Sequence, residues 1–463
     1  MSMLNIGSSA LLAAQTALAT TSHNISNVNT VGYSRQRTDQ GTQPANFEGG
    51  YYIGNGVGIT GVDRIFNQFL INQLRTYTSA ESQQDGFLTF SKQVDDLLGT
   101  SSLSINGGLE AFFNSVQEVA NDPTSIAARQ VMLTQGELLA NRFNTMDSQL
   151  NELDRQIDNT ISVSINHINV LSQGIVDLNK SISESLASGY KPNDLLDKRD
   201  KLINDLSELV SVNVVEQGNG SVNVFIGNGQ GLVVGNTRTV LSAIPDNSTN
   251  PPRTAIGYGS SQINITQQIT GGEIGGALLA RTSIVDTTRA ELDVLAAAVV
   301  TAFNDVHDNG IDLNGNAGTN FFNPAGTTAG TMRMAITDPR LIAASSTTNS
   351  GVGNNENALA MAALQTDKTT VVLNPGPPVI SRSFNEQYGS IVSQVATRTN
   401  QASVTQQTQA GLVSQIRQRA ESVSGVNLDE EAANLIKFQQ AYQAASQIIT
   451  VSNTVFNSLL NAL

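Results

Sequence analysis

The last forty residues carry a seven-residue apolar repeat, the pattern of a helix that must lie along another helix. Within residues 424–463 a large apolar side chain returns every seven positions, at Leu428, Leu435, Tyr442, Ile449, Phe456 and Leu463. A second series lies three residues after members of the first, at Phe438, Ala445 and Leu459. Asn427 is suited to cap this helix, and acidic residues 429–431 favour its first turn. After them Lys437 is the one charged residue, so the helix lacks an ordinary solvated face.

The first residues of the chain repeat the pattern. Leu4, Leu11, Leu18 and Ile25 are also seven apart, and residues 1–34 contain no Asp, Glu, Lys or Arg. Two interpretations stay open. Either the two ends complete one ordinary globular core, or they are kept for other copies of the chain, because a lone monomer does not comfortably cover two such helices.

The chain between the two ends is expected to form a long helical rod. Apolar residues keep steps of three and four from Phe143 to Ile182, which predicts a helix about 60 Å long. Residues 211–272 instead alternate β-branched and polar positions between Gly and Asn turns, which predicts a small β insert. We expect this insert at the end of the rod opposite the chain termini. The polar stretch 399–409 predicts a buried Gln/Thr layer or looser packing in the last long helix.

The predicted fold class is therefore α+β and multidomain. A helical coiled-coil or bundle rod brings the terminal helices together and carries the inserted β domain. The predicted units are a terminal assembly domain (1–35 with 425–463), a helical rod (36–210 with 274–309 and 381–424), the β insert (211–273) and a loop-rich or partly β segment (310–380).

Composition excludes several classes of function. The 25 Lys and Arg stand against 39 Asp and Glu, and a net charge of −14 argues against a nucleic-acid partner. No apolar run is long enough for a transmembrane helix. Cysteine is absent, which removes disulfides and thiolate chemistry. Residues 10–19 resemble a secretory leader only weakly, because no basic residue precedes them, so no cleaved signal peptide is expected.

Patterns typical of cofactor and metal sites do not develop into a site. Residues 56–61 match G-x-G-x-x-G, but helix after helix is expected to follow, so we interpret 41–61 as a glycine-rich connector. Around Asp312, a partial calcium-loop pattern lacks the sixth-position Gly and the closing Glu, which favours a plain turn. The full set of its candidate ligands is Asp308, Asp312, Asn314 and Asn316.

The remaining titratable residues also predict no chemistry. The three histidines, His23, His167 and His307, form no zinc-binding pair. The acidic residues Asp194, Asp197 and Asp200 alternate with basic ones and are interpreted as a solvated helix face. No catalytic, cofactor or metal site is predicted, and an enzyme is the weakest interpretation.

The segment after the first helix resembles a known signature. In residues 22–36, SHNISNVNTVGYSRQ, the residue types that end helices and turn are Asn24, Asn27, Asn29 and Gly32. The Asn-Ile-x-Asn-x-Asn-Thr-x-Gly-Tyr pattern resembles flagellar rod, hook and hook-associated proteins, and residues 34–36 resemble the FlgK family of hook-associated proteins. Residues 424–449 resemble the C-terminal signature of the same family.

This resemblance implies a structural subunit, not an enzyme, that forms a homo-oligomeric ring at the junction of hook and filament. It implies hook protein and the second hook-associated protein FlgL as neighbours, the export chaperone FlgN, and secretion by the flagellar type III route. It implies no nucleic acid, cofactor or membrane insertion. The alternatives are another axial protein of hook or rod type and a secreted membrane-active effector, which the missing basic residues disfavour.

The predicted assembly residues follow from the repeats and the signature. Because their apolar stripes lack partners in a lone chain, both ends are expected to be disordered in the free monomer. The predicted set is Leu4, Leu11, Leu18, Ile25, Asn27, Asn29, Gly32, Tyr33, Leu428, Leu435, Tyr442, Ile449, Phe456 and Leu459.

Overall fold

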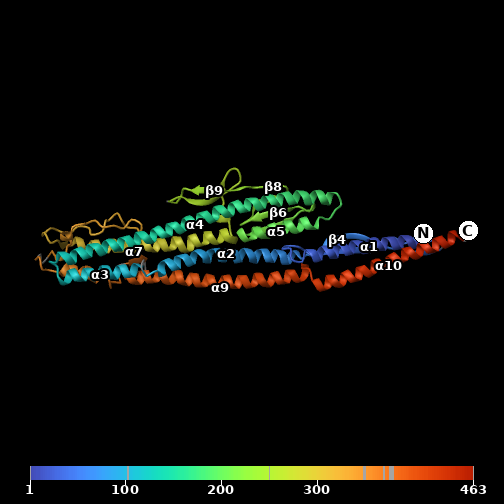
Figure 1. The fold of residues 1–463 in the computed structure, drawn as a ribbon. Helices are drawn as coiled ribbons and strands as arrows, with labels where there is room; N and C mark the ends of the chain where they lie inside the picture. The colour runs from blue at the N-terminus through green and yellow to red at the C-terminus, as the bar shows by residue number, and fades with distance from the viewer. Residues whose placement is uncertain are drawn as a thin grey trace.

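The computed structural model is a long rod whose two chain ends lie together at one tip (Figure 1). It has the predicted α+β class, with long helices and small antiparallel sheets. Leu463 and part of the loop-rich segment, 375–379, lie outside the described residues. The structure describes residues 2–48, 50–101, 104–249, 251–347, 351–368, 371–374 and 380–461.

Long helices run side by side along the rod. They are α2 (Gln68–Gly99), α3 (Ile105–Asn121), α4 (Ile126–Ala187), α5 (Asn193–Leu209), α6 (Gly272–Ala280), α7 (Asp286–Asp308) and α9 (Phe384–Ser424). A π turn, η2 (Arg281–Val285), joins α6 to α7. The 62 residues of α4 span about 90 Å, so the prediction of about 60 Å was too short. The sequence did not indicate the first part of α4, because its buried positions before Phe143 include Arg129, Gly136 and Ala140, which are not large apolar residues.

An aromatic cluster closes the rod at the end far from the termini. Phe303 lies at its centre, with its ring centroid 5.0 Å from that of Phe112 and 4.9 Å from that of Phe321. These tilted contacts are the arrangement that aromatic quadrupoles favour. Phe113, Phe322 and Phe384 complete the cluster, which packs α3, α7 and α9 together.

The β insert packs against α4 midway along the rod (Figure 1). Its strands are β5 (Val212–Glu216), β6 (Val222–Ile226), β7 (Gln230–Val234), β8 (Thr237–Arg238), β9 (Leu241–Asp246), β10 (Arg253–Tyr258) and β11 (Ile263–Asn264). They form a four-stranded sheet, β5-β6-β7-β8, and a three-stranded sheet, β11-β10-β9. A short 3₁₀ turn, η1 (Thr266–Gln268), follows them. The expected position at the far tip was wrong, because the inner faces of these strands join the apolar core of the rod.

The loop-rich segment occupies the far tip instead. It contains β12 (Gly310–Ile311), η3 (Pro339–Leu341), β13 (Ser345–Ser346), α8 (Glu356–Ala363), β14 (Val371–Asn374) and β15 (Ile380–Arg382). The stretch around Asp312 forms a turn, as predicted: the Asp312 carboxylate accepts the backbone N–H groups of Asn314 and Asn316, each at 2.8 Å. The division of the chain into four domains stays a prediction.

One local expectation was wrong, and another was wrong in part. Residues 41–61, predicted to be a connector, belong largely to a ribbon of β1 (Gln36–Thr42) paired antiparallel to β4 (Val57–Arg64) and to a small hairpin, β2 (Asn46–Glu48) with β3 (Tyr51–Ile53). Their polar and glycine-rich sequence lacks the apolar alternation that marks a strand. The stretch 399–409 was expected to form a buried Gln/Thr layer or to pack more loosely. It forms no such layer, because Thr399 is its one buried Gln or Thr and its glutamines are exposed or half-buried. Looser packing there stays a prediction.

Because His307 is buried, we expect the far tip of the rod to lose stability in acid. Its Nδ1 lies 2.5 Å from the Thr319 carbonyl oxygen, and its Nε2 accepts the Ala343 N–H at 3.0 Å, so the ring is neutral. Burial, aided by nearby Arg129, lowers the pKa of His307 from 6.5 to about 4, against the Thr319 bond and Asp312. A depressed folded pKa gives stability that is present above pH 6.5 and is lost as the pH falls toward 4, about 3 kcal/mol in total.

We therefore expect the pH dependence of urea unfolding between pH 7 and 4 to become shallower in His307→Asn by up to that amount. Exposed His167 supplies the control, and His167→Asn should keep the wild-type pH profile. An unchanged profile in His307→Asn would contradict the neutral buried ring.

Candidate assembly site

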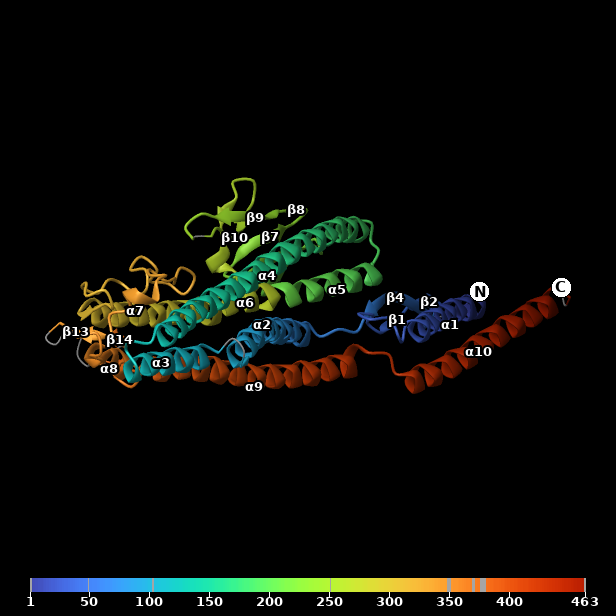
Figure 2. The ribbon, with the colours of Figure 1, turned by 60° about the vertical axis from the view of Figure 1, so that its left-hand side comes forward.

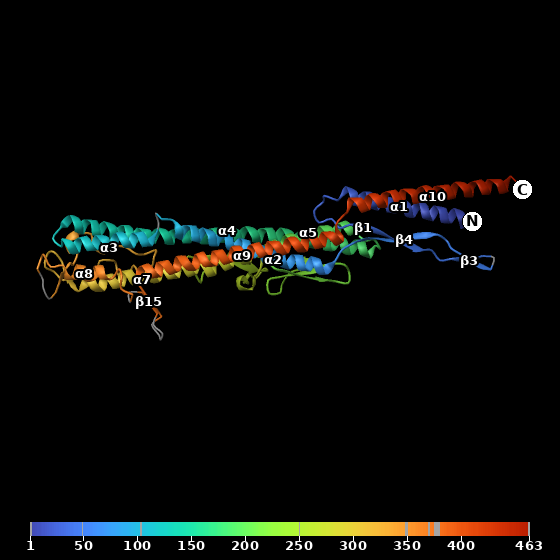
Figure 3. The ribbon, with the colours of Figure 1, turned by 90° about the horizontal axis from the view of Figure 1, so that it is seen from below.

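The two terminal helices lie side by side in a single chain. Helix α1 (Ser2–Ser26) runs along α10 (Leu428–Leu460), which continues beyond α9 after a break at 425–427 (Figures 2 and 3). The expectation that both ends are disordered in a lone chain therefore does not describe this structure, in which they are paired helices. Their disorder in solution stays a prediction.

Small residues line the buried side of α1, which packs on α10 and on the β1–β4 ribbon. Gly7, Ala14 and Thr21 are seven apart and buried, and Ala17 is fully buried beside them. A Cβ on Gly7 would lie only 3.0 Å from a side-chain carbon of Ile449, so this glycine permits the close approach. Facing them on α10, Ala445 is also buried. Sequence analysis missed this second repeat because its members are too small to mark a stripe.

The predicted seam of large apolar residues is only partly covered. Leu11, Leu18, Ile25, Leu435 and Ile449 are half-buried, whereas Leu4, Leu428, Tyr442 and Phe456 are exposed. The side chain of Leu459 lies outside the described residues. Other large apolar side chains on the same pair are exposed as well, namely Met3, Leu12, Ile436, Ile448, Val451, Val455 and Leu460. The pair thus presents many exposed large apolar side chains, a feature that marks a contact site.

Buried Asn24 locks the signature segment against α1. Its Nδ2 donates to the Gln36 carbonyl oxygen at 2.8 Å, and its Oδ1 accepts the Gln36 N–H at 2.9 Å. The Tyr33 hydroxyl donates to the same Oδ1 at 2.7 Å. The amide therefore pairs with Gln36 as a neighbouring strand would, and it turns the chain from α1 into β1. Sequence analysis placed Asn24 in the turn but did not include it among the assembly residues.

The predicted signature residues have different positions in this turn. Asn27 accepts the Thr30 hydroxyl proton at 3.1 Å and donates to the His23 carbonyl at 3.0 Å, so it ends the helix. Gly32 has a φ of 84°, which glycine adopts without strain. Asn29 is exposed. Tyr33 is half-buried, and this burial, with Asp194 and Asp197 nearby, raises the pKa of its hydroxyl.

An ionic joint connects this terminal module to the rod. Asp197 of α5 accepts the Ser34 N–H at 2.8 Å and a guanidinium N–H of Arg64 at 2.9 Å. Arg64 also reaches Asp200 at 2.6 Å, and Arg75 reaches Asp200 at 2.9 Å. Although burial opposes its charge, the two aspartates raise the pKa of Arg64 and keep it ionised. The interpretation as a solvated face was wrong for Asp197 and Asp200, because Arg64 of β4 lies over both carboxylates. Asp194 is exposed, as expected.

The C-terminal helix is attached to the same joint. Arg35 forms an ion pair with Glu430 at 2.5 Å, and its backbone N–H donates to the Ser424 carbonyl at 2.8 Å. The Asn427 Oδ1 accepts the Asp429 N–H at 2.9 Å, which confirms the predicted cap of α10. Two consecutive residues, Arg35 just before β1 and Gln36 at its start, therefore hold both terminal helices.

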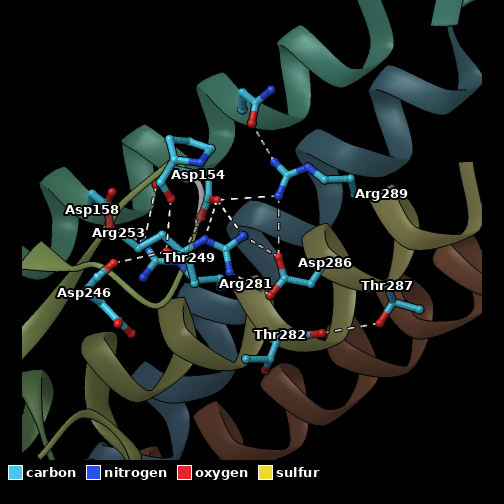
Figure 4. Close-up of polar contacts among 12 residues, drawn as sticks. Asp154, Asp158, Asp246, Thr249, Arg253, Arg281, Thr282, Asp286, Thr287 and Arg289 are labelled. Carbon is cyan, nitrogen blue, oxygen red and sulfur yellow. Dashed lines mark hydrogen bonds and ion pairs between the residues drawn. The ribbon is translucent and has the colours of Figure 1, made fainter. Parts of the chain in front are cut away.

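A second charged network holds the β insert to the rod (Figure 4). Arg253 of β10 pairs with Asp154 of α4 at 2.7 Å and with Asp286 of α7 at 3.0 Å. Arg281, in the π turn, pairs with Asp154 at 2.9 Å and also with Asp158. These carboxylates are neutralised by guanidinium groups. Across the part of the chain that the structure describes, no group of His, Cys, Asp or Glu is arranged to hold a metal ion.

Both ends of the chain match families of flagellar axial proteins. The model of flagella basal body rod proteins matches residues 4–33, and the C-terminal model of flagellar basal body rod FlgEFG proteins matches residues 417–462. These two matches cover most of α1 and all of α10, the paired helices described above. The fold and the paired ends are thus those of an axial protein of the bacterial flagellum.

The middle of the chain narrows the family. The model of the flagellar hook-associated protein FlgK helical domain matches residues 91–322. Flagellar hook-associated protein 1 of Escherichia coli K12 is 31% identical over 99% of both chains, and that of Bacillus subtilis 168 is 27% identical over 98% of this chain and 96% of its own. This chain belongs to the FlgK family of flagellar hook-associated proteins. The resemblance stated from the two signatures is confirmed.

A solved structure agrees in fold. The flagellar hook junction protein FlgK of Burkholderia pseudomallei superimposes with a TM-score of 0.68 over 76% of this chain and all of its own, at 20% identity. The Escherichia coli alignment spans 554 positions, more than the 463 residues here, so that relative carries inserted residues that this chain lacks. None of the described helices is both long and apolar enough to cross a lipid bilayer.

We expect Asn24→Ala to loosen the turn, because it leaves the buried N–H and C=O of Gln36 without their partner. Such a loss costs about 1–3 kcal/mol, so amide exchange at Gln36 should become about 10- to 100-fold faster. Hydrogen exchange read by NMR or mass spectrometry over residues 33–40 measures it. The control is Asn29→Ala in the same turn, which should change exchange little. Equal effects of the two variants would contradict the lock.

Proposed function

We propose that this chain is a structural subunit of the hook–filament junction and that copies of it form a ring through α1 and α10. The observation that carries this proposal is the exposed apolar surface of the α1–α10 pair. Pairing buries the small residues of α1, so the larger apolar side chains stay outside for a neighbour. Membership of the FlgK family supports the location at the junction.

The predicted assembly residues have roles of two kinds in this proposal. Exposed residues such as Leu4, Tyr442 and Phe456 contact neighbouring copies directly. The turn residues Asn27, Gly32 and Tyr33 set the angle between the terminal module and the rod, so they act by positioning α1. The absence of charge from residues 1–34 supports packing between like copies, since no ionic group has to be desolvated there.

For partners we propose hook protein on one side of the ring and the second hook-associated protein, FlgL, on the other. We further propose that the export chaperone FlgN covers α10 before assembly and that export follows the flagellar type III route. The exposed apolar side of α10 supports a chaperone, because a surface of this kind promotes aggregation when uncovered. The role proposed is structural, without catalysis.

The test of location is electron microscopy of hooks from cells that lack this chain. We expect hooks of normal length that carry no attached filament, and expression of the chain should restore filament attachment. Filaments attached normally in its absence would reject the junction role. Immunogold labelling of an epitope in the β insert should place the chain at the hook tip.

The α10 surface predicts a strong effect of a buried charge. In Phe456→Asp, a carboxylate would be buried between copies at a cost of several kcal/mol, which weakens association at least about 100-fold. Motility and junction formation should be lost, while circular dichroism of the purified chain stays helical. The matched control is Val163→Asp on the exposed side of α4, which should remain motile. Normal junctions in Phe456→Asp would contradict the proposed surface.

In the isolated chain, we also expect α1 and α10 to exchange amide hydrogens faster than α4. The pair buries few large apolar residues, so its local opening costs less free energy than opening of the rod. Exchange followed by mass spectrometry on monomer and on assembled junctions measures this, and protection of both helices should rise on assembly. Equal protection of α1, α10 and α4 in the monomer would argue against it.

A further inference from the structure

The β2–β3 hairpin carries an unpartnered aromatic tip. Phe47 pairs with Tyr52 across the hairpin, with ring centroids 5.1 Å apart, and Tyr51 follows on the adjacent position. All three side chains are exposed, Tyr52 to 78%. Residues 43–56 contain one charged residue, Glu48. A lone two-stranded hairpin is at best marginally stable in water, and exposed apolar side chains mark contact sites. We therefore expect another protein surface to cover this tip.

The base of the hairpin is fixed to α1. Gly56, with a φ of 95°, lies so close to α1 that a Cβ on it would be 2.2 Å from the Ser9 Oγ and 3.3 Å from the Ile6 Cα. The β1–β4 ribbon also packs along α1. Figure 3 shows the hairpin reaching away from α1 and α10 beyond this base. The base of the hairpin is therefore held in one place relative to the terminal helices, and the aromatic side chains of its tip stay exposed.

A groove lined by polar and charged as well as apolar residues lies elsewhere on the same module. It has a volume of about 620 Å³ between α1, β1 and α10. Its floor is formed by small residues of α1, among them Ala10, Ala14 and Ala17, and Thr38 of β1 and Phe438 of α10 are in its walls. Lys437 also lines it. The exposed Arg37 guanidinium and Lys437 ammonium offer cation–π contacts to an incoming aromatic ring, and the adjacent phenylalanine offers an aromatic contact.

We propose that the aromatic tip of the β2–β3 hairpin of one copy docks into the α1–β1–α10 groove of a second copy. This inference rests on the proposed self-assembly and names one contact within it. A projecting tip and a separate groove on one chain make a head-to-tail contact, which generates rings or helical arrays instead of closed dimers. A tip that docks on an identical chain always meets the same groove.

The area involved suits a component of a larger interface. Three aromatic side chains bury about 450–750 Å² when covered. A stable interface needs about 800 Å² on each partner, so the tip supplies much of one side and the exposed faces of α1 and α10 supply the rest. The contact therefore strengthens the ring without holding a dimer on its own, and the free chain stays monomeric.

Cross-linking tests the contact directly, because the chain has no cysteine of its own. Tyr52→Cys and Lys437→Cys are placed in separate copies, co-expressed in cells that lack the wild-type chain, and treated with a short bis-maleimide. We expect a two-chain product from assembled junctions that is at least tenfold more abundant than with either variant alone. Tyr190→Cys, an equally exposed tyrosine on the rod, replaces Tyr52→Cys as the control and should give only background.

Other outcomes overturn the inference. A copy that carries both Tyr52→Cys and Lys437→Cys, diluted among wild-type copies, would form a cross-link within one chain if the hairpin filled its own groove. That product would overturn the contact between copies. Cross-links from Tyr52→Cys to hook protein or another chain would name a different partner. Assembled junctions without the two-chain product reject this contact and leave the proposed function standing. Failure of wild-type copies to assemble at all rejects both.

A second measurement does not depend on cross-linking. Tyr52→Ser removes an aromatic anchor and should reduce the amount of chain incorporated at hook tips at least tenfold, with the helical circular dichroism unchanged. Tyr190→Ser should incorporate as the wild type does. Equal incorporation of both variants would overturn the role of the tip.

Discussion

The contact between α1 and α10 through small side chains is the constraint on which the remaining structure depends. Because Gly7 lies against Ile449, α1 and α10 approach closely there, while larger side chains such as Leu4 and Phe456 stay exposed. One chain can therefore pair its own ends and still present apolar surface to others. Had Leu4 and Phe456 faced inward, the pairing of α1 with α10 would have buried these side chains within one chain. Little exposed apolar surface would then remain for contacts with other copies.

The joint and the rod give this paired module a fixed direction. Asn24 turns the chain into β1, Arg35 just before β1 holds α10, and Arg64 anchors the ribbon to Asp197 of the rod. The charged groups at the joint lie in small clusters in which each carboxylate faces a guanidinium. The attraction within such a buried pair is offset by the cost of removing both charges from water, whereas removing one partner leaves an uncompensated charge. These contacts therefore specify geometry more than they add stability. The cluster around Asp154 does the same for the β insert (Figure 4).

Sequence reasoning recovered elements with strong periodicity and missed those held by tertiary contacts. The long helix α4 and the strands β5–β7 were predicted because large or β-branched residues repeat along them. The β1–β4 ribbon was not, since its strands are polar and gain their order from packing on α1. The ionic joint was also missed, because Arg64 and Asp197 lie far apart along the chain and only the fold brings them together. The Asp197 carboxylate looked solvated because its own helix is rich in charge.

The sequence by itself determined that both ends are charge-poor helices, that they belong with axial flagellar proteins and that a long helical rod separates them. Tertiary structure alone decided which side of each terminal helix faces inward. On α1 two stripes share the same period of seven, one through Leu4 and Leu11 and one through Gly7 and Ala14. Periodicity shows that a stripe exists, but it carries no information about which stripe meets which partner. That choice follows from how closely two backbones can approach, which is a property of the packed pair.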